Sequence, residues 1–290
     1  MKLLLIGASG VLGSRLYNDA IKKKWNVLGT YCARKNEALY YLDLKHRKSI
    51  EGIFRFFKPE LVILAGGITN VDQCQIEPKL AYEVNVKGSL DIIKKAKQVG
   101  AKLVFLSTDY VFDGKKGPYK EEDKPSPINI YGKTKLEVEE SIKGLLKDYL
   151  IVRTAQIYGL DPRSKNFAIK ILRIMKNNKK IYAACDSYST PTYVGGLSNS
   201  ILGLIEMKKS GIFNVSGADF LNRYEYVIEI ADIFELNKAL IEKVKLKDLN
   251  LKAERPKRAG LKIDKIKREL GVFLYGCREG LNLLKKDVTI

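Results

Sequence analysis

The feature that most constrains this chain is a run of three evenly spaced glycines near its amino terminus. Gly7, Gly10 and Gly13 follow an apolar segment, residues 2–6, and open an amphipathic segment that runs to about Lys23. Glycines between a strand and a helix permit a tight turn and a close approach of the backbone to a pyrophosphate, while the helix N-terminus supplies amide donors. An ordinary glycine turn is the alternative, which this context disfavours. We therefore predict a dinucleotide site whose turn contacts are Gly7, Ser9, Gly10, Val11, Leu12 and Gly13.

Apolar segments alternate with helical patterns through the first half of the chain. The segments that we interpret as strands are residues 2–6, 26–31, 39–42, 61–65, 102–106 and 149–153. Such alternation predicts an α/β fold with a doubly wound parallel sheet of the Rossmann type. In these sheets the nucleotide binds outside the carboxyl ends of the strands, where the glycine turn is expected to lie.

The alternation changes after about residue 160. Helical patterns cover residues 166–176, 194–207 and 224–234, and short apolar segments occur at 181–184 and 212–215. We predict a dinucleotide-binding domain over residues 1–160 and a smaller, mixed substrate-binding lobe over residues 161–290. The helix at 194–208 is expected to return to the first domain. The crevice between the two parts is the expected substrate site.

Composition and charge exclude several classes of function. The net charge is +19, but the basic residues are spread along the chain, which indicates a charged, solvated surface rather than a nucleic-acid or membrane site. The four cysteines lack metal-type spacing and the chain has one histidine, so we expect neither a metal site nor a histidine-based triad. No apolar run approaches the roughly 20 residues of a membrane span, and we expect a cytoplasmic protein.

The loop after the second predicted strand bears on the choice of cofactor. NAD-binding folds commonly end this strand with an acidic residue, whereas this chain has Arg34 and Lys35. Two cations favour the 2′-phosphate of NADPH; if they are only solvated loop residues, NADH stays open. The other expected cofactor contacts, around the adenine and the riboses, are Asp43, Leu44, Ala65, Gly66, Gly67 and Asn85.

Tyr131 and Lys135 are four residues apart, so they project from one face of the predicted helix. A lysine ammonium near a phenol lowers the pKa of the tyrosine, which can then deliver a proton to a carbonyl oxygen while a hydride reaches the carbon. This spacing alone is common. Its value here comes from Ser107 and Thr108, which end a buried strand and are expected at the same edge of the sheet.

Together these motifs resemble the extended short-chain dehydrogenases/reductases and, within them, the dTDP-4-dehydrorhamnose reductase family. The most specific block runs from residue 107 to 114 and from 127 to 135, and further matches extend over nearly the whole chain. These matches are at residues 70–72, 77–78, 166–167, 191–192 and 255–256. The chain is also similar to the regulatory beta subunit of methionine adenosyltransferase, which belongs to the same branch.

The resemblance implies reduction of a 4-keto-6-deoxy sugar carried on a nucleoside diphosphate, as in dTDP-L-rhamnose biosynthesis. It implies that Tyr131 donates the proton, that Lys135 binds the nicotinamide ribose and lowers the pKa of Tyr131, and that Thr108 hydrogen-bonds the sugar. The implied partner is a nucleotide sugar, and a homodimer is an option that the sequence leaves open. The implied substrate contacts are Thr108, Asp109, Tyr110, Gln156, Arg255 and Arg258.

One departure from the family keeps other interpretations open. Gln156 occupies a position where reductases of this family usually carry a tryptophan beside the sugar. This difference favours the alternative of a non-catalytic, NADP-binding regulatory subunit similar to the beta subunit. An epimerase or dehydratase of nucleotide sugars is a third option, but it would normally retain NAD, and Arg34 and Lys35 argue against that.

Overall fold

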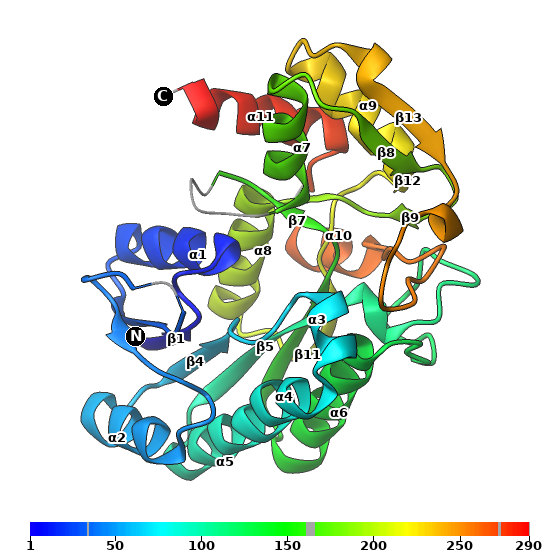
Figure 1. Ribbon diagram of the computed structural model, residues 1–290. Helices are drawn as coiled ribbons and strands as arrows, with labels where there is room; N and C mark the ends of the chain where they lie inside the picture. The colour runs from blue at the N-terminus through cyan, green and yellow to red at the C-terminus, as the bar shows by residue number, and fades with distance from the viewer. Residues whose placement is uncertain (34, 161–165, 272–273, 290) are drawn as a thin grey trace.

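The computed structural model describes residues 1–33, 35–160, 166–271 and 274–289. Within these residues, a parallel sheet of seven strands has the order β11-β6-β5-β4-β1-β2-β3 (Figure 1). Its strands are β1 (Lys2–Ile6), β2 (Asn26–Tyr31), β3 (Tyr40–Tyr41), β4 (Leu61–Leu64), β5 (Lys102–Thr108), β6 (Tyr149–Thr154) and β11 (Gly211–Asn214). The predicted doubly wound fold is confirmed, and the segment near residue 212 adds a strand beside β6.

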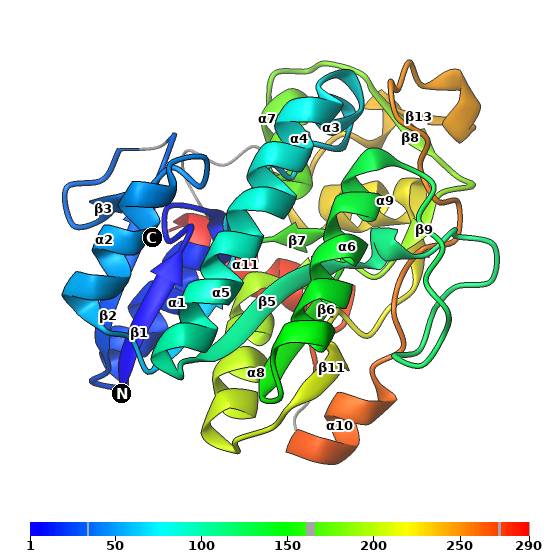
Figure 2. The same ribbon diagram turned by 90° about the horizontal axis from the view of Figure 1, so that it is seen from below.

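Helices cover both faces of this sheet. They are α1 (Val11–Lys22) and α8 (Val194–Glu206) on one face, and α2 (Arg47–Phe57), α5 (Ser89–Val99) and α6 (Ile130–Leu145) on the other, as Figure 2 shows. Successive residues of β1 serve the two faces alternately: Leu3 and Leu5 join the core under α1 and α8, whereas Leu4 and Ile6 join the core under the other layer. Burial on both faces explains why these strands are almost wholly apolar.

The stretch from Pro78 to Val99 is helical but is not one regular α-helix. It consists of α4 (Pro78–Tyr82), a π-helical segment η1 (Glu83–Gly88) and α5, and it follows the short helix α3 (Val71–Ile76). A π-helical turn has one residue more than an α-helical turn, and such turns occur frequently at functional sites. Here the turn brings the buried Asn85 against the loop that follows β4.

The second lobe contains three two-stranded sheets among the described residues. They pair β7 (Ile157–Tyr158) with β10 (Thr192–Tyr193), β8 (Ile181–Ala184) with β13 (Ile241–Val244), and β9 (Tyr188–Ser189) with β12 (Leu221–Asn222). The helices of the lobe are α7 (Phe167–Lys176), α9 (Arg223–Ile233) and α11 (Cys277–Thr289), and α10 (Asp264–Leu270) lies near β11. No helix within the described residues is long and apolar enough to cross a membrane.

Helix α8 is followed along the chain by β11, and both belong to the large sheet and its helix layers rather than to the second lobe. The Ser198 hydroxyl on α8 donates a hydrogen bond of 2.8 Å to Asp19 on α1, and Lys23 pairs with Glu206 at 2.8 Å. The chain therefore passes between the sheet and the second lobe three times: after β6, before α8 and after β11. These connections hold the lobe beside the sheet.

Candidate active site

A cleft of about 910 Å³ lies at the carboxyl ends of the central strands. Its size is in the range of cofactor sites. Many of the predicted site residues line it, and they come from segments spread over the first half of the chain. They are Gly7, Ser9, Gly10, Val11, Leu12, Gly13, Asp43, Leu44, Ala65, Gly66, Gly67, Thr108, Tyr131, Lys135 and Gln156.

The glycine turn forms one wall of the cleft. The Gly7 amide donates to the Thr30 hydroxyl at 3.2 Å, and the Gly10 amide donates to the Gly7 carbonyl at 3.1 Å. Helix α1 begins at the next residue, Val11, so its free amides point toward the cleft. A Cβ atom at Gly13 would collide with the Gly7 carbonyl, which means that only glycine lets the helix lie this close to the turn. The wall is therefore suited to a pyrophosphate.

The part of the cleft near β2 is lined by residues that differ partly from those we predicted. Asp43 is buried, and its carboxylate accepts a hydrogen bond of 2.9 Å from the Lys45 amide. Lys45 itself lines the cleft, whereas Lys35 is exposed and does not. Arg34 lies outside the described residues. Lys45 comes four residues after β3, whose pairing with β2 brings this segment to the cleft.

Asn85 stands behind the cleft wall rather than in it. Its amide group exchanges two hydrogen bonds with the backbone of Ile68: the Ile68 amide donates to Oδ1 at 2.7 Å, and Nδ2 donates to the Ile68 carbonyl at 3.0 Å. Ile68 lines the cleft directly after Gly66 and Gly67. Asn85 therefore supports the segment that faces the cleft.

The start of α6 places Tyr131 beside the end of β5. Asn129 caps the helix by accepting a hydrogen bond of 2.9 Å from the Gly132 amide. A Cβ atom at Gly132 would collide with the Tyr110 carbonyl, so the helix approaches the turn after Thr108 very closely. The rings of Tyr110 and Tyr131 meet edge to face with centroids 6.2 Å apart.

The pKa of Tyr131 is raised in this structure, whereas the sequence predicts that it is lowered. Burial raises the pKa of Tyr131 above its ordinary value, with a smaller opposing effect from the Thr108 hydroxyl. The Lys135 ammonium donates to the Leu106 carbonyl at 2.8 Å and lies 4.6 Å from the centre of the Phe105 ring. Burial therefore outweighs any stabilisation of the phenolate by the Lys135 charge. Tyr131 is a protonated phenol at neutral pH, which is the form that a proton donor needs.

Thr108 and Asp109 complete this end of the site. The Thr108 hydroxyl lines the cleft and accepts a hydrogen bond of 3.2 Å from the Tyr110 amide. Asp109 is buried below it, where its carboxylate accepts hydrogen bonds from Ser189 at 3.3 Å and from the Gly260 amide at 3.2 Å. Burial raises the pKa of Asp109 to about 6. Asp109 therefore joins the second lobe to β5 instead of lining the cleft.

Gln156 adopts an unusual backbone conformation in the cleft wall. Its φ is +41°, in the left-handed region that a side chain normally avoids. Among the described residues, the Gln156 amide nitrogen and the Thr154 hydroxyl are buried without a hydrogen-bond partner, and both residues line the cleft. An unpaired buried polar group costs about 1–3 kcal/mol, so a ligand that pairs with these atoms would regain that energy. Such strained, unsatisfied groups are typical of binding sites.

The structure brings one unpredicted arginine close to the site and separates the two predicted ones from the cleft. Arg255 pairs with Asp72 at 3.0 Å, and Arg258 is exposed over the ring of Tyr188, 4.6 Å from its centre. Arg223, at the start of α9, hydrogen-bonds Tyr110 and lies 4.7 Å from the centre of the Phe167 ring. Arg223 carries no motif in the sequence. Only the fold shows that it is near Tyr110.

The described part of the chain contains no set of side chains that could bind a metal ion. No group of three or more His, Cys, Asp and Glu side chains gathers there. The chemistry that the site offers is instead a protonated tyrosine, a neighbouring lysine and a threonine hydroxyl, all at the end of a dinucleotide-sized cleft. This arrangement suits transfer of a proton to an oxygen atom that is held beside Thr108.

Comparison with known sequences gives the same family that the motifs resemble. The model of the RmlD substrate binding domain matches residues 1–290. A dTDP-4-dehydrorhamnose reductase from Aggregatibacter actinomycetemcomitans is 30% identical, with 93% of this chain and 94% of the relative covered. The methionine adenosyltransferase 2 subunit beta of Xenopus tropicalis is 32% identical over 81% of this chain and 72% of that protein.

Comparison with solved structures also finds dTDP-4-dehydrorhamnose reductases. A dTDP-4-dehydrorhamnose reductase from Bacillus anthracis in complex with NADP superposes with a TM-score of 0.89 at 28% identity, covering 99% of both chains. A hypothetical dTDP-4-dehydrorhamnose reductase from Sulfolobus tokodaii is 33% identical, with a TM-score of 0.86 over 95% of this chain and 97% of that chain. The family match extends over the entire sequence and the predicted resemblance is confirmed: this chain belongs to the RmlD family, the family of the dTDP-4-dehydrorhamnose reductases.

Proposed function

We propose that this protein is an NADPH-dependent oxidoreductase that reduces the 4-keto group of a 6-deoxy sugar linked to a nucleoside diphosphate, with dTDP-4-dehydrorhamnose as its substrate. The observation that carries the proposal is the position of Tyr131, Lys135 and Thr108 at one end of a cleft whose other wall is the glycine turn. The proposed substrate and cofactor are inferred from the related reductases, one of which was solved with NADP.

The residues of the cleft fit a dinucleotide. The glycine turn and the amides of α1 would hold the pyrophosphate, and the Gly66–Gly67 segment leaves space for a ribose. Lys45 lines the end of the cleft near β2, where it would meet a ribose 2′-phosphate, and Lys35 remains in the proposal as a second cation. NADH stays the alternative cofactor if the loop cations are only solvated.

The chain's own residues would carry the proton. Tyr131 holds its proton at neutral pH because burial raises its pKa, and it would pass that proton to the carbonyl oxygen of the sugar. The Thr108 hydroxyl would hold that oxygen in place. The charge of Lys135 would stabilise the phenolate that remains on Tyr131. The bound nicotinamide would supply the hydride.

The experiment is to mix the purified protein with NADPH and dTDP-4-dehydro-6-deoxy-L-mannose and to follow the absorbance of the reduced nicotinamide. We expect rapid oxidation in the wild type and a rate about 10²–10⁴-fold lower in Tyr131→Phe, because a general acid is lost. Tyr82→Phe is the matched control, since Tyr82 is exposed on α4. Full activity in Tyr131→Phe would exclude the proposed mechanism.

The similarity to the methionine adenosyltransferase beta subunits defines the second candidate function, a regulatory subunit that binds NADP. Tight binding of NADPH without oxidation would favour it over the reductase, and co-purification with a second chain would then support it. A self-associated protein with turnover would count against it. The reductase proposal includes a homodimer. It also includes a cytoplasmic location, because free cysteines suit a reducing compartment.

A further inference from the structure

One face of α6 carries a row of chemically active side chains that continues below the cleft. Tyr131, Lys135 and Glu139 follow one another at intervals of four residues, so they lie along the same side of the helix. Tyr131 and Lys135 line the cleft, whereas Glu139 is 0% exposed, one turn deeper in the protein. A carboxylate this deeply buried needs a partner, because taking its charge out of water is unfavourable.

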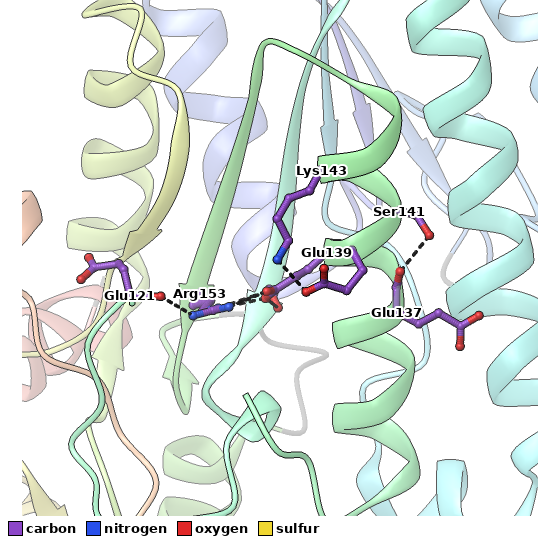
Figure 3. A network of polar contacts seen from close by, with 8 residues as sticks. Glu121, Glu137, Glu139, Ser141, Lys143 and Arg153 are labelled. Carbon is purple, nitrogen blue, oxygen red and sulfur yellow. Dashed lines mark hydrogen bonds and ion pairs between the residues drawn. The ribbon is translucent and has the colours of Figure 1, made fainter. Parts of the chain in front are cut away.

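The partner of Glu139 is Arg153 on β6, which is 1% exposed (Figure 3). Arg153 Nη2 lies 2.6 Å from Glu139 Oε2, and Arg153 Nε lies 3.0 Å from Oε1. The Ser107 hydroxyl at the end of β5 donates a third, short hydrogen bond of 2.5 Å to Oε1. The carboxylate is therefore held by groups from two strands.

The far side of Arg153 is also held. Its Nη1 donates to the Glu121 carbonyl at 3.2 Å, and its guanidinium lies 5.1 Å from the centre of the Phe112 ring. The buried pair thus joins three elements whose neighbouring residues line the cleft: β5 with Thr108, β6 with Thr154, and α6 with Tyr131. A fixed geometry of this kind sets the distance between proton donor and reacting oxygen.

The groups around Lys135 have little charge besides that of Glu139. On β5 it meets the Phe105 ring and the Leu106 carbonyl, and on α3 it faces the thiol of Cys74, whose pKa is raised to about 11 by burial. From α6 itself the charge that acts on it is that of Glu139, four residues further along the helix. Among the described residues, Glu139 is thus the anion whose field acts on the lysine, and Asp109 acts on Tyr131 from the other side.

We propose that Glu139, fixed by Arg153 and Ser107, is a positioning residue that keeps Lys135 charged and holds the helix of Tyr131 in register with Thr108. This inference rests on the proposed ketoreductase function. Burial lowers the pKa of Lys135 to about 8, and Glu139 opposes that decrease. Without the Glu139 charge, the unpaired Arg153 cation would lower the pKa of Lys135 further. The lysine would then lose its proton near neutral pH, and the phenolate of Tyr131 would lose its stabilising cation.

The test is the pH profile of kcat. In the wild type we expect the rate to fall on the alkaline side as Lys135 deprotonates near pH 8. In Glu139→Gln we expect this fall to begin about one pH unit lower, as is typical when one nearby charge is removed. The double variant Glu139→Gln with Arg153→Gln removes both charges and should return the alkaline limb toward that of the wild type. The control is Glu140→Gln, because Glu140 is exposed on the same helix and pairs with Lys143 at 2.6 Å.

An unpaired buried arginine strongly destabilises a protein, so the folding of Glu139→Gln is measured first. If Glu139→Gln does not fold, the double variant and Ser107→Ala replace it, since neither leaves a charge unpaired. Ser107→Ala should shift the alkaline limb of the kcat profile to lower pH, by less than Glu139→Gln does. An alkaline limb that stays at the wild-type pH in every folded variant would overturn the inference.

A second readout separates this inference from the proposed function. If the wild type reduces no nucleotide sugar, the function fails, but the titration of the Lys135 ammonium can still be followed by NMR of ¹³C-labelled lysine. A lower titration midpoint in Glu139→Gln than in the wild type would support the role of Glu139 without any catalytic assay. Equal midpoints would contradict it.

Discussion

Arg223 belongs to no sequence motif, yet its side chain contacts Tyr110 beside the candidate active site. Its guanidinium lies between Tyr110 and Phe167, and the Tyr110 ring touches that of Tyr131. Its positive charge also lowers the pKa of the buried Asp109, although burial raises that pKa more. A cation one side chain away from the proton donor is suited to the hydroxyls and phosphates of a nucleotide sugar.

We predict that Arg223→Met raises the KM for the nucleotide sugar by roughly 10–100-fold, which corresponds to the loss of about 1.5–3 kcal/mol from a charged hydrogen bond. The kcat and the KM for NADPH should stay within about twofold of the wild type, because the proton donor and the glycine turn are untouched. Steady-state kinetics with each substrate varied in turn measure this. Arg278→Met, on α11 and paired with Glu229, is the control. An unchanged KM for the sugar would exclude the contact.

At this scale the sequence predicts residues whose role is set by near neighbours in the chain. The glycine spacing and the Tyr131–Lys135 interval are of this kind, and those residues do line the cleft. The pKa of Tyr131 is not, because it depends chiefly on burial by other parts of the fold. Arg223 is far from Tyr110 in the sequence, so no local pattern announces their contact.

Among the elements, η1 carries the residue that supports the Ile68 segment of the cleft wall. The π-helical turn presents Asn85 to the backbone of Ile68, and Nδ2 also lies 3.4 Å from the Thr134 hydroxyl on α6. Asn85→Ala would leave the Ile68 amide and carbonyl unpaired, at a cost of about 1–3 kcal/mol. We predict a Kd for NADPH that is roughly 5–100-fold higher, measured by fluorescence titration. Asn282→Ala on α11 is the control, and equal affinity in both variants would show that η1 does not support the cleft.

The π-helical turn η1 has no signal in the local sequence, since it is stabilised by a partner near residue 68. The strands of the large sheet were predicted because burial on both faces makes them continuously apolar. The short strands of the second lobe pair residues distant in sequence, such as Ile181 with Ile241, and β13 has no clear apolar pattern. Its pairing is a tertiary effect that propensity does not encode.

At the scale of the whole molecule, one loop ties the second lobe to two helices of the first domain. The loop around residues 252–255 is tied to α3 by Asp72, whose Oδ1 accepts hydrogen bonds from the Lys252 amide at 3.0 Å and the Ala253 amide at 2.9 Å and pairs with Arg255 at 3.0 Å. The same loop is tied to α6, because Asn129 Nδ2 donates to the Glu254 carbonyl at 2.9 Å. Asn129 caps the helix of Tyr131, so the lobe is anchored directly beside the proton donor.

The contribution of this anchor should depend on pH. Partial burial raises the pKa of Asp72, but the Ala253 amide and the Arg255 charge outweigh that effect, so the pKa lies below its ordinary value. A carboxylate with a lowered pKa in the folded state stabilises the fold above its unfolded-state pKa of about 3.9 and loses that effect as the pH falls through the folded value. We therefore predict that Asp72→Asn lowers the free energy of unfolding by about 1–3 kcal/mol at pH 7 and by progressively less below about pH 4. Urea denaturation of both proteins across this range measures the difference. A difference that is the same at pH 7 and at pH 3.5 would mean that the Asp72 charge does not hold the lobe.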